Sequence, residues 1–121
     1  MVNEERNAVR EKSYAFALRV IGLARLLRNE REFELAGQLL RSGTSIGANV
    51  EEAQAAHSRP DFVAKMSIAA KEARETHYWL RLLRDSKTGP LHGLAGLLRE
   101  ADELIRLLTA IVKTGQRSAN S

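Results

Sequence analysis

The sequence of 121 residues contains no cysteine and only two prolines, and aromatic residues make up 5% of it. The absence of cysteine excludes disulfides, thiolate metal sites and cysteine nucleophiles. Aromatic residues are scarce and Val, Ile and Thr together number only 16, which argues against a β-sandwich or β-barrel. No apolar run approaches the ~18 residues that a membrane-spanning helix needs. The N-terminus is charged and lacks the apolar core of a signal peptide, so we expect a cytoplasmic protein.

Alanine and leucine dominate the composition, with 17 residues each, and hydrophobic residues reach 44%. Both are strong helix formers, and this apolar content can bury a modest core. The length fits one domain, which we expect to span residues 1–121. The formal net charge is +4, and 14 of the 19 basic residues are arginine. This excess is modest, so it permits nucleic-acid binding without demanding it.

Apolar residues recur with helical spacing in four segments. These segments are Glu5–Arg28, Phe33–Ala56, a third between the capping sequence Ser58–Asp61 and the loop Asp85–Pro90, and His92–Lys113. Four amphipathic helices joined by short loops predict an all-α fold, an up-down-up-down four-helix bundle. We expect an ordered core over about residues 5–113 and a frayed tail over residues 115–121.

Two of the segments define their core-facing residues most clearly. The first has an apolar stripe at Val9, Phe16, Val20, Leu23 and Leu27, which Tyr14, Leu18 and Ile21 are expected to widen. The third has a heptad seam at Phe62, Met66, Ala69, Ala73, Thr76, Leu80 and Leu83.

The second segment also carries a polar stripe beside its apolar one, formed by Gln38, Ser42, Ser45, Asn49 and Glu52. The third segment has a partner stripe at Ile68, Glu72, Glu75, Trp79 and Leu82. One interpretation is a solvated helix face. The other is a hydrogen-bonded network at a helix or subunit contact, because serine and asparagine are poor helix formers that need side-chain partners. Under this second interpretation Asn49 and Glu75 should be largely buried.

Gly43 and Gly47 lie four residues apart in the same segment. Each costs about 1 kcal/mol relative to alanine in a helix interior. Close approach of another helix, or a local kink, would compensate for this cost. The pattern favours such packing over a phosphate-binding loop, because the segment lacks the P-loop lysine and a preceding strand.

The segment Leu40–Ala53 resembles the signature of small four-helix-bundle proteins encoded within bacterial large-subunit rRNA intervening sequences. This family also includes the accessory variability proteins of diversity-generating retroelements. The matching positions are Gln38, Arg41, Ser45, Ile46, Asn49, Val50 and Glu52, and Ile68–Leu80 resembles a second block with Glu75 as its characteristic acid. Two positions depart from the family pattern: Gly47 stands where proline is frequent, and Gln54 stands where glycine is frequent.

The resemblance implies a bundle that assembles as a ring-like homopentamer. In the retroelement branch it implies binding to a reverse transcriptase and to nucleic acid. The residues assigned to the family motif and to assembly are Gln38, Arg41, Ser45, Asn49, Glu52, Glu75 and Trp79.

The sequence shows no catalytic pattern, and we expect no enzyme activity, metal or cofactor. His57, His77 and His92 are scattered and form no His-x-x-x-His or Glu-x-x-His pair. Glu72 and Glu75 are three residues apart, but a di-iron bundle also needs a histidine three residues after the acid.

Arginines along the first and third segments are the candidates for a nucleic-acid surface: Arg10, Arg19, Arg25, Arg28, Arg81 and Arg84. The expected partners are therefore further copies of the chain, and RNA, DNA or a nucleic-acid-handling protein such as a reverse transcriptase. The alternative is a protein–protein interaction scaffold with no nucleic-acid binding, in which the arginines only keep the surface soluble.

Overall fold

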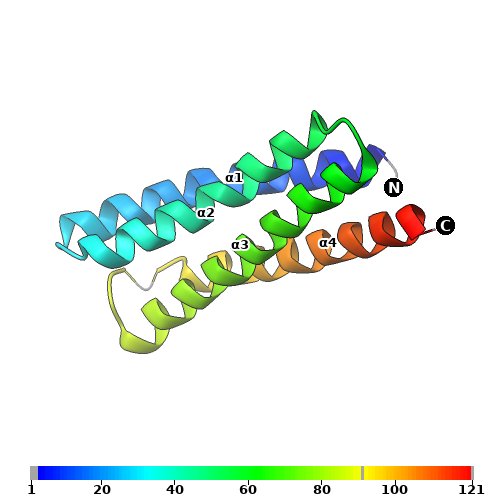
Figure 1. The fold of residues 1–121 in the computed structure, drawn as a ribbon. Helices are drawn as coiled ribbons and strands as arrows, with labels where there is room; N and C mark the ends of the chain where they lie inside the picture. Colours follow the sequence, from blue (N-terminus) through cyan, green and yellow to red (C-terminus); the bar gives the residue numbers. More distant parts are fainter. Residues whose placement is uncertain (1–2, 91, 121) are drawn as a thin grey trace.

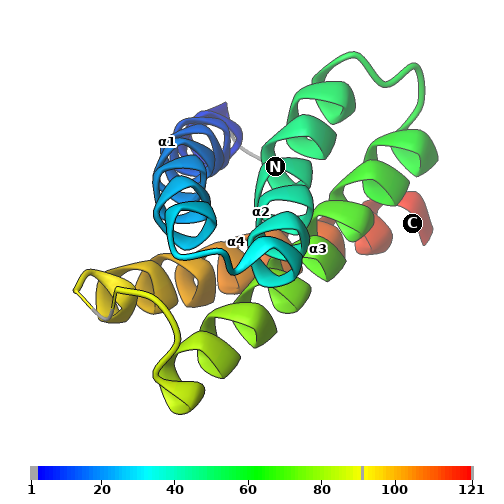
Figure 2. The same ribbon diagram turned by 90° about the vertical axis from the view of Figure 1, so that its left-hand side faces the viewer.

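The computed structural model describes residues 3–90 and 92–120 and contains four helices in that range. They are α1 (Asn3–Asn29), α2 (Phe33–Gln54), α3 (Arg59–Ser86) and α4 (Leu94–Asn120). Consecutive helices run in opposite directions and lie beside each other, and both ends of the chain lie at the same end of the bundle (Figure 1). Figure 2 shows the other end, where α4 also meets α1 across the core. The predicted all-α, up-down-up-down bundle is confirmed.

The core contains the apolar faces that the sequence predicts. Its largest fully buried side chains include Phe16, Leu27, Leu39, Ile46, Met66, Leu80, Leu83, Leu104 and Leu108. The prediction that Tyr14 and Leu18 widen the core face of α1 is wrong, since they are 66% and 55% exposed. Both lie on the side of α1 that turns away from Val20 and Leu27, and a four-helix core has room for only one stripe per helix.

The loops are set by local backbone chemistry. Ser58 caps α3, because its Oγ accepts a hydrogen bond from the Asp61 amide at 3.1 Å, as predicted. At its other end α3 is capped by Lys87, which adopts the left-handed conformation with φ of 54°. This helix is therefore not capped by a glycine. Gly89 serves a different purpose: its φ is +75°, and a Cβ there would lie 2.5 Å from Leu27 Cδ2. The α3–α4 connection therefore packs directly against α1.

Several helix ends differ from the prediction by one or two residues, and the end of α4 differs most. Helix α4 continues to Asn120 rather than fraying after Lys113, and the remaining tail residue, Ser121, lies outside the described residues. Two factors favour the longer helix. Each residue added to an existing helix gains a backbone hydrogen bond, and Gly115 is buried against Val63 of α3. Helix α2 ends slightly early, at Gln54.

Glycine lets α1 and α2 approach closely. A Cβ on Gly43 would lie 2.7 Å from Val20 Cγ1 and 2.9 Å from Val20 Cγ2, closer than carbon atoms pack. This geometry favours the packing interpretation of Gly43. By contrast, a Cβ on Gly37, earlier in α2, would meet nothing within 4 Å.

These two glycines give a matched test of the close approach. We expect Gly43→Ala to destabilise the protein by about 1–3 kcal/mol, because the added methyl overpacks the contact with Val20. Gly37→Ala should instead stabilise it by up to about 1 kcal/mol, since alanine is the better helix former and the space is open. Urea unfolding followed by circular dichroism measures both. Equal effects of the two substitutions would contradict the packing role of Gly43.

Candidate functional site

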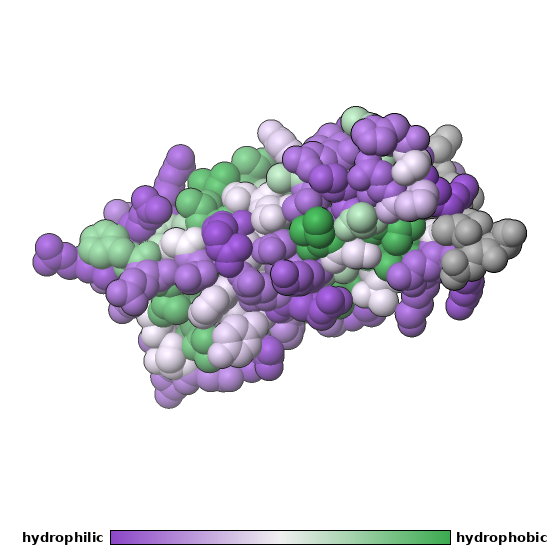
Figure 3. Space-filling model, viewed as in Figure 1, coloured by the Kyte–Doolittle hydropathy of each residue, from purple (hydrophilic) through white to green (hydrophobic). Residues whose placement is uncertain are grey.

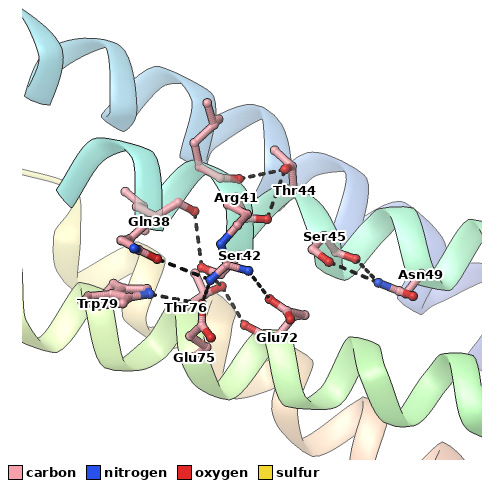
Figure 4. Close-up of polar contacts among 12 residues, drawn as sticks. Gln38, Arg41, Ser42, Thr44, Ser45, Asn49, Glu72, Glu75, Thr76 and Trp79 are labelled. Atoms are coloured by element: carbon pink, nitrogen blue, oxygen red, sulfur yellow. Dashed lines mark hydrogen bonds and ion pairs between the residues drawn. The ribbon is translucent and has the colours of Figure 1, made fainter. Parts of the chain in front are cut away.

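The polar stripes of α2 and α3 meet in a network centred on Arg41 (Figure 4). The Arg41 guanidinium reaches from α2 to α3 and donates to Glu75 Oε2, and its Nη1 lies 3.7 Å from Glu72 Oε2. It also donates to Gln38 Oε1 at 3.4 Å, within α2. Trp79 Nε1 donates to the same Glu75 oxygen at 3.4 Å. One arginine therefore orders four neighbouring side chains from two helices.

Below this network lies a buried pair of hydroxyls. The Thr76 hydroxyl donates to Ser42 Oγ at 2.9 Å, and both side chains are fully buried. Thr76 Oγ1 also lies 2.8 Å from the Glu72 carbonyl oxygen, one turn earlier in α3. Because buried hydroxyls are costly without partners, this pair fixes how α2 and α3 sit against each other.

Glu72 is the most unusual member of the network. Its side chain is only 11% exposed, and its buried Oε2 forms no hydrogen bond with a described residue. The nearest positive charge is Arg41, whose own side chain is 56% exposed. Two carboxylates, Glu72 and Glu75, therefore share one guanidinium, and the group carries a net negative charge.

The remaining predicted assembly residues lie further along α2. Asn49 Nδ2 donates to Ser45 O at 2.9 Å and to Ser45 Oγ at 3.2 Å, so this contact stays within the helix. Glu52 pairs with Lys65 of α3 at 3.2 Å. The stripe predicted from the sequence is thus continuous from Gln38 to Glu52, but only part of it joins the two helices.

The predicted burial of Asn49 and Glu75 needs correction, because both are half-buried. The buried polar side chains of this region are Ser42, Glu72 and Thr76. Asn49 is satisfied by its own helix and Glu75 points outward to Arg41, so neither needs to enter the core. The sequence placed Thr76 on the apolar seam of the third segment. Its hydrogen bond to Ser42 could have been predicted only by aligning the two helices side by side.

Three of the six candidate arginines form ion pairs. Arg10 pairs with Glu51 of α2 at 3.2 Å, and Arg19 pairs with Glu100 of α4. Arg84 pairs with its neighbour Asp85 at 2.8 Å, and this hydrogen bond holds the pKa of the Asp85 carboxyl below its usual value. These arginines join helices or neutralise a nearby acid.

The other three arginines form no ion pair with a described residue. Arg25 and Arg28 are exposed near the C-terminal end of α1. Arg81 is exposed on α3 and lies over the Tyr78 ring, with its guanidinium carbon 5.6 Å from the ring centroid. The structure therefore does not bring all six arginines together, but it leaves Arg25 and Arg28 close to each other and unpaired.

Groups suited to acid–base or metal chemistry do not cluster in residues 3–90 and 92–120, where no three His, Asp or Glu side chains could hold a metal ion together. Partial burial, and then the neighbouring Arg81, lower the pKa of His77 and so favour its neutral form. Within the same described ranges, no helix combines the length and apolar character that crossing a bilayer requires.

The fold and the α2–α3 network define a small helical-bundle protein whose motif residues form structural contacts. The chain belongs to the 23S rRNA-intervening sequence protein family, whose model matches residues 5–110. This confirms the resemblance seen in the motif around Arg41. A comparison with curated proteins found no match to the chain.

A solved structure shares this fold. It is the crystal structure of a protein of unknown function from the S23 ribosomal protein family of Bacteroides thetaiotaomicron. The two chains are 44% identical with a TM-score of 0.85, and the match covers 90% of this chain and 98% of the relative. Neither the family nor this relative is described as an enzyme.

The burial of Glu72 beside Arg41 leads to a prediction about stability. We expect Arg41→Leu to destabilise the protein by about 1–3 kcal/mol, because it leaves the buried Glu72 carboxylate without a counter-charge. The loss stays in this range because Arg41 is more than half exposed, so water already screens its charge. Arg10→Leu is the matched control: Arg10 and Glu51 are both exposed, so its loss should not exceed about 1 kcal/mol. Urea unfolding measures both, and an equal loss would mean that Glu72 does not depend on Arg41.

Proposed function

We propose that the protein is a cytoplasmic, non-enzymatic homo-oligomer that binds nucleic acid through a basic surface around Arg25 and Arg28. The main observation in its support is that these two arginines are exposed, lie one turn apart and form no ion pair with a described residue. The matching family is named for the 23S rRNA intervening sequence, and the solved relative is assigned to a ribosomal protein family; neither name states a bound partner. A nucleic-acid-handling protein, such as a reverse transcriptase, is the partner class that the family resemblance adds.

Assembly is supported by apolar side chains left outside the core. Ile68 and Leu82 are exposed on α3 and flank the network of Glu75 and Trp79 on the same helix. The face of the molecule in Figure 3 carries apolar patches separated by polar side chains. Apolar centres bordered by polar groups are typical of subunit interfaces. The α2–α3 face is therefore the proposed interface, with five copies in a ring as the resemblance implies.

Assembly would also strengthen nucleic-acid binding. Each copy has a net charge of +4, and a symmetric ring repeats the same unpaired arginines around one rim. Phosphates attract such a rim regardless of base sequence. The sum of several copies compensates for the modest charge of one.

One observation favours the alternative, a protein–protein interaction scaffold that binds no nucleic acid. Arg10, Arg19 and Arg84 are already paired with acids, so half of the candidate arginines offer phosphates little charge. The scaffold would use the same apolar face of α3. The two functions differ in one measurable property, which is salt-dependent binding to polyanions.

Assembly is tested by mass and by substitution. Light scattering at micromolar concentration should give several times the chain mass of 13.5 kDa. Ile68→Asp combined with Leu82→Asp should reduce the mass toward that of one chain, since buried charges at an interface are costly. Circular dichroism should remain helical, because both side chains are exposed in the single chain.

The matched control is Tyr14→Asp combined with Leu18→Asp, which places the same charges on the exposed face of α1. The control should keep the wild-type mass. Dissociation by the α1 pair alone would move the interface to α1, and a monomeric wild type would refute assembly.

Nucleic-acid binding is tested by anisotropy with single- and double-stranded RNA and DNA. We expect sequence-independent binding that weakens steeply between about 0.05 and 0.15 M salt, because each neutralised phosphate releases counterions. Arg25→Glu combined with Arg28→Glu should abolish binding. The helicity and the oligomer mass should stay unchanged.

Arg99→Glu combined with Arg117→Glu is the charge-matched control, because both arginines are exposed on α4 outside the candidate set. This pair should weaken binding only slightly. If neither RNA nor DNA binds at low salt, the scaffold function remains; if the α4 pair is as damaging as the α1 pair, net charge rather than a surface accounts for binding.

A further inference from the structure

A pocket of about 260 Å³ opens at the end of the bundle that carries both chain termini, on the right in Figure 1. All four helices supply lining side chains, among them Arg6 of α1, Ala53 of α2, Phe62 of α3 and Ile111 of α4. Arg25 and Arg28 lie at the opposite end of α1, so the pocket is separate from the proposed nucleic-acid surface.

The pocket is positively charged. Arg6 and Arg59 both line it, and none of the described residues that line it carries a carboxylate. Neither arginine forms an ion pair or a hydrogen bond with a described side chain. The Arg6 guanidinium carbon lies 4.9 Å from the centroid of the Phe62 ring, which holds this group over the aromatic face.

Arg6 also has an unsatisfied donor. Its Nε is buried and has no hydrogen-bond partner among the described residues. A buried N–H without an acceptor is unfavourable, and buried donors in folded proteins almost always find one. Because Nε itself is buried, an acceptor in the pocket would be bound by the outer nitrogens of the Arg6 guanidinium.

The other walls are mostly apolar, formed by Ala53, Phe62 and Ile111, with Thr114 as a polar side chain among them. A guanidinium donates two parallel N–H bonds to the two oxygens of a carboxylate, and the apolar walls suit a hydrocarbon body attached to that carboxylate. The volume lies below the ~300–1,000 Å³ of pockets for drug-sized ligands, so the ligand must be small. We propose that this pocket binds a small carboxylate with a short apolar body.

The test uses the full-length protein and three probes: hexanoate, its neutral analogue hexanamide, and acetate. Methyl NMR should show saturable shifts at Ile111 and Ala53 with hexanoate, with a dissociation constant no weaker than about 10 mM. Hexanamide lacks the charge and acetate lacks the apolar body, so each should bind about tenfold more weakly or worse. Leu26, at the other end of α1, should not shift.

The key variant is Arg6→Gln, which should weaken hexanoate binding at least about tenfold. Arg28→Gln is the matched control on the same helix and should leave it unchanged. If Arg6→Gln does not fold, Arg59→Gln provides the same comparison at the exposed start of α3. Absence of saturable hexanoate shifts, equal binding of all three probes, or unchanged binding after loss of the tested arginine would overturn the proposal. RNA binding should be unaffected by Arg6→Gln, which separates this result from the proposed function.

Discussion

The close approach of α2 to its neighbours is the constraint on which the rest of the structure depends. Gly43 lets Val20 of α1 lie against the backbone of α2, and small buried residues such as Ser42 and Ala53 line the same helix. At this separation the Ser42 and Thr76 hydroxyls can bond directly, and Arg41 can reach Glu75 on α3. Larger side chains would push the helices apart and break these polar contacts, since packed interiors leave little room to adjust. Packing and polar pairing on α2 are therefore one requirement rather than two.

This requirement explains why the residues of the family motif bond mainly to one another. Arg41 is occupied by two carboxylates, and Asn49 bonds to its own helix. Groups whose bonding capacity is already satisfied inside the chain are poorly suited to bind substrates. At the edge of the motif, Ile68 and Leu82 are exposed on α3, the helix that also carries the half-buried Trp79. The motif thus borders the α3 surface that we propose as the subunit interface.

The sequence was sufficient to predict the four helices, because their apolar periodicity and the Ser58 cap are local signals. It also located the polar stripes of α2 and α3. It could not decide which acid enters the core, since Glu72 and Glu75 occupy the same stripe and only the crossing of α2 and α3 places one inside. It misplaced Tyr14 because the width of a buried face depends on how many helices surround it. The ion pairs of Arg10 and Arg19 join residues far apart in the chain, so the sequence alone could not predict them either.

The distribution of arginines along α1 separates the two proposed anion-binding sites within one small bundle. Arg10 and Arg19 are paired across the helix contacts near the middle of α1, so their charge is largely neutralised. The arginines without ion pairs on this helix lie toward its two ends. Arg25 and Arg28 are exposed, so they suit an extended polyanion, whose many phosphates gain from repeated copies of the same rim. Arg6 lies over Phe62 beside apolar walls, where one compact anion with a hydrocarbon body fits and a polyanion does not. The same type of side chain thus suits different anions in the two proposals, because burial and neighbouring aromatic surface, rather than charge alone, determine which anion gains most.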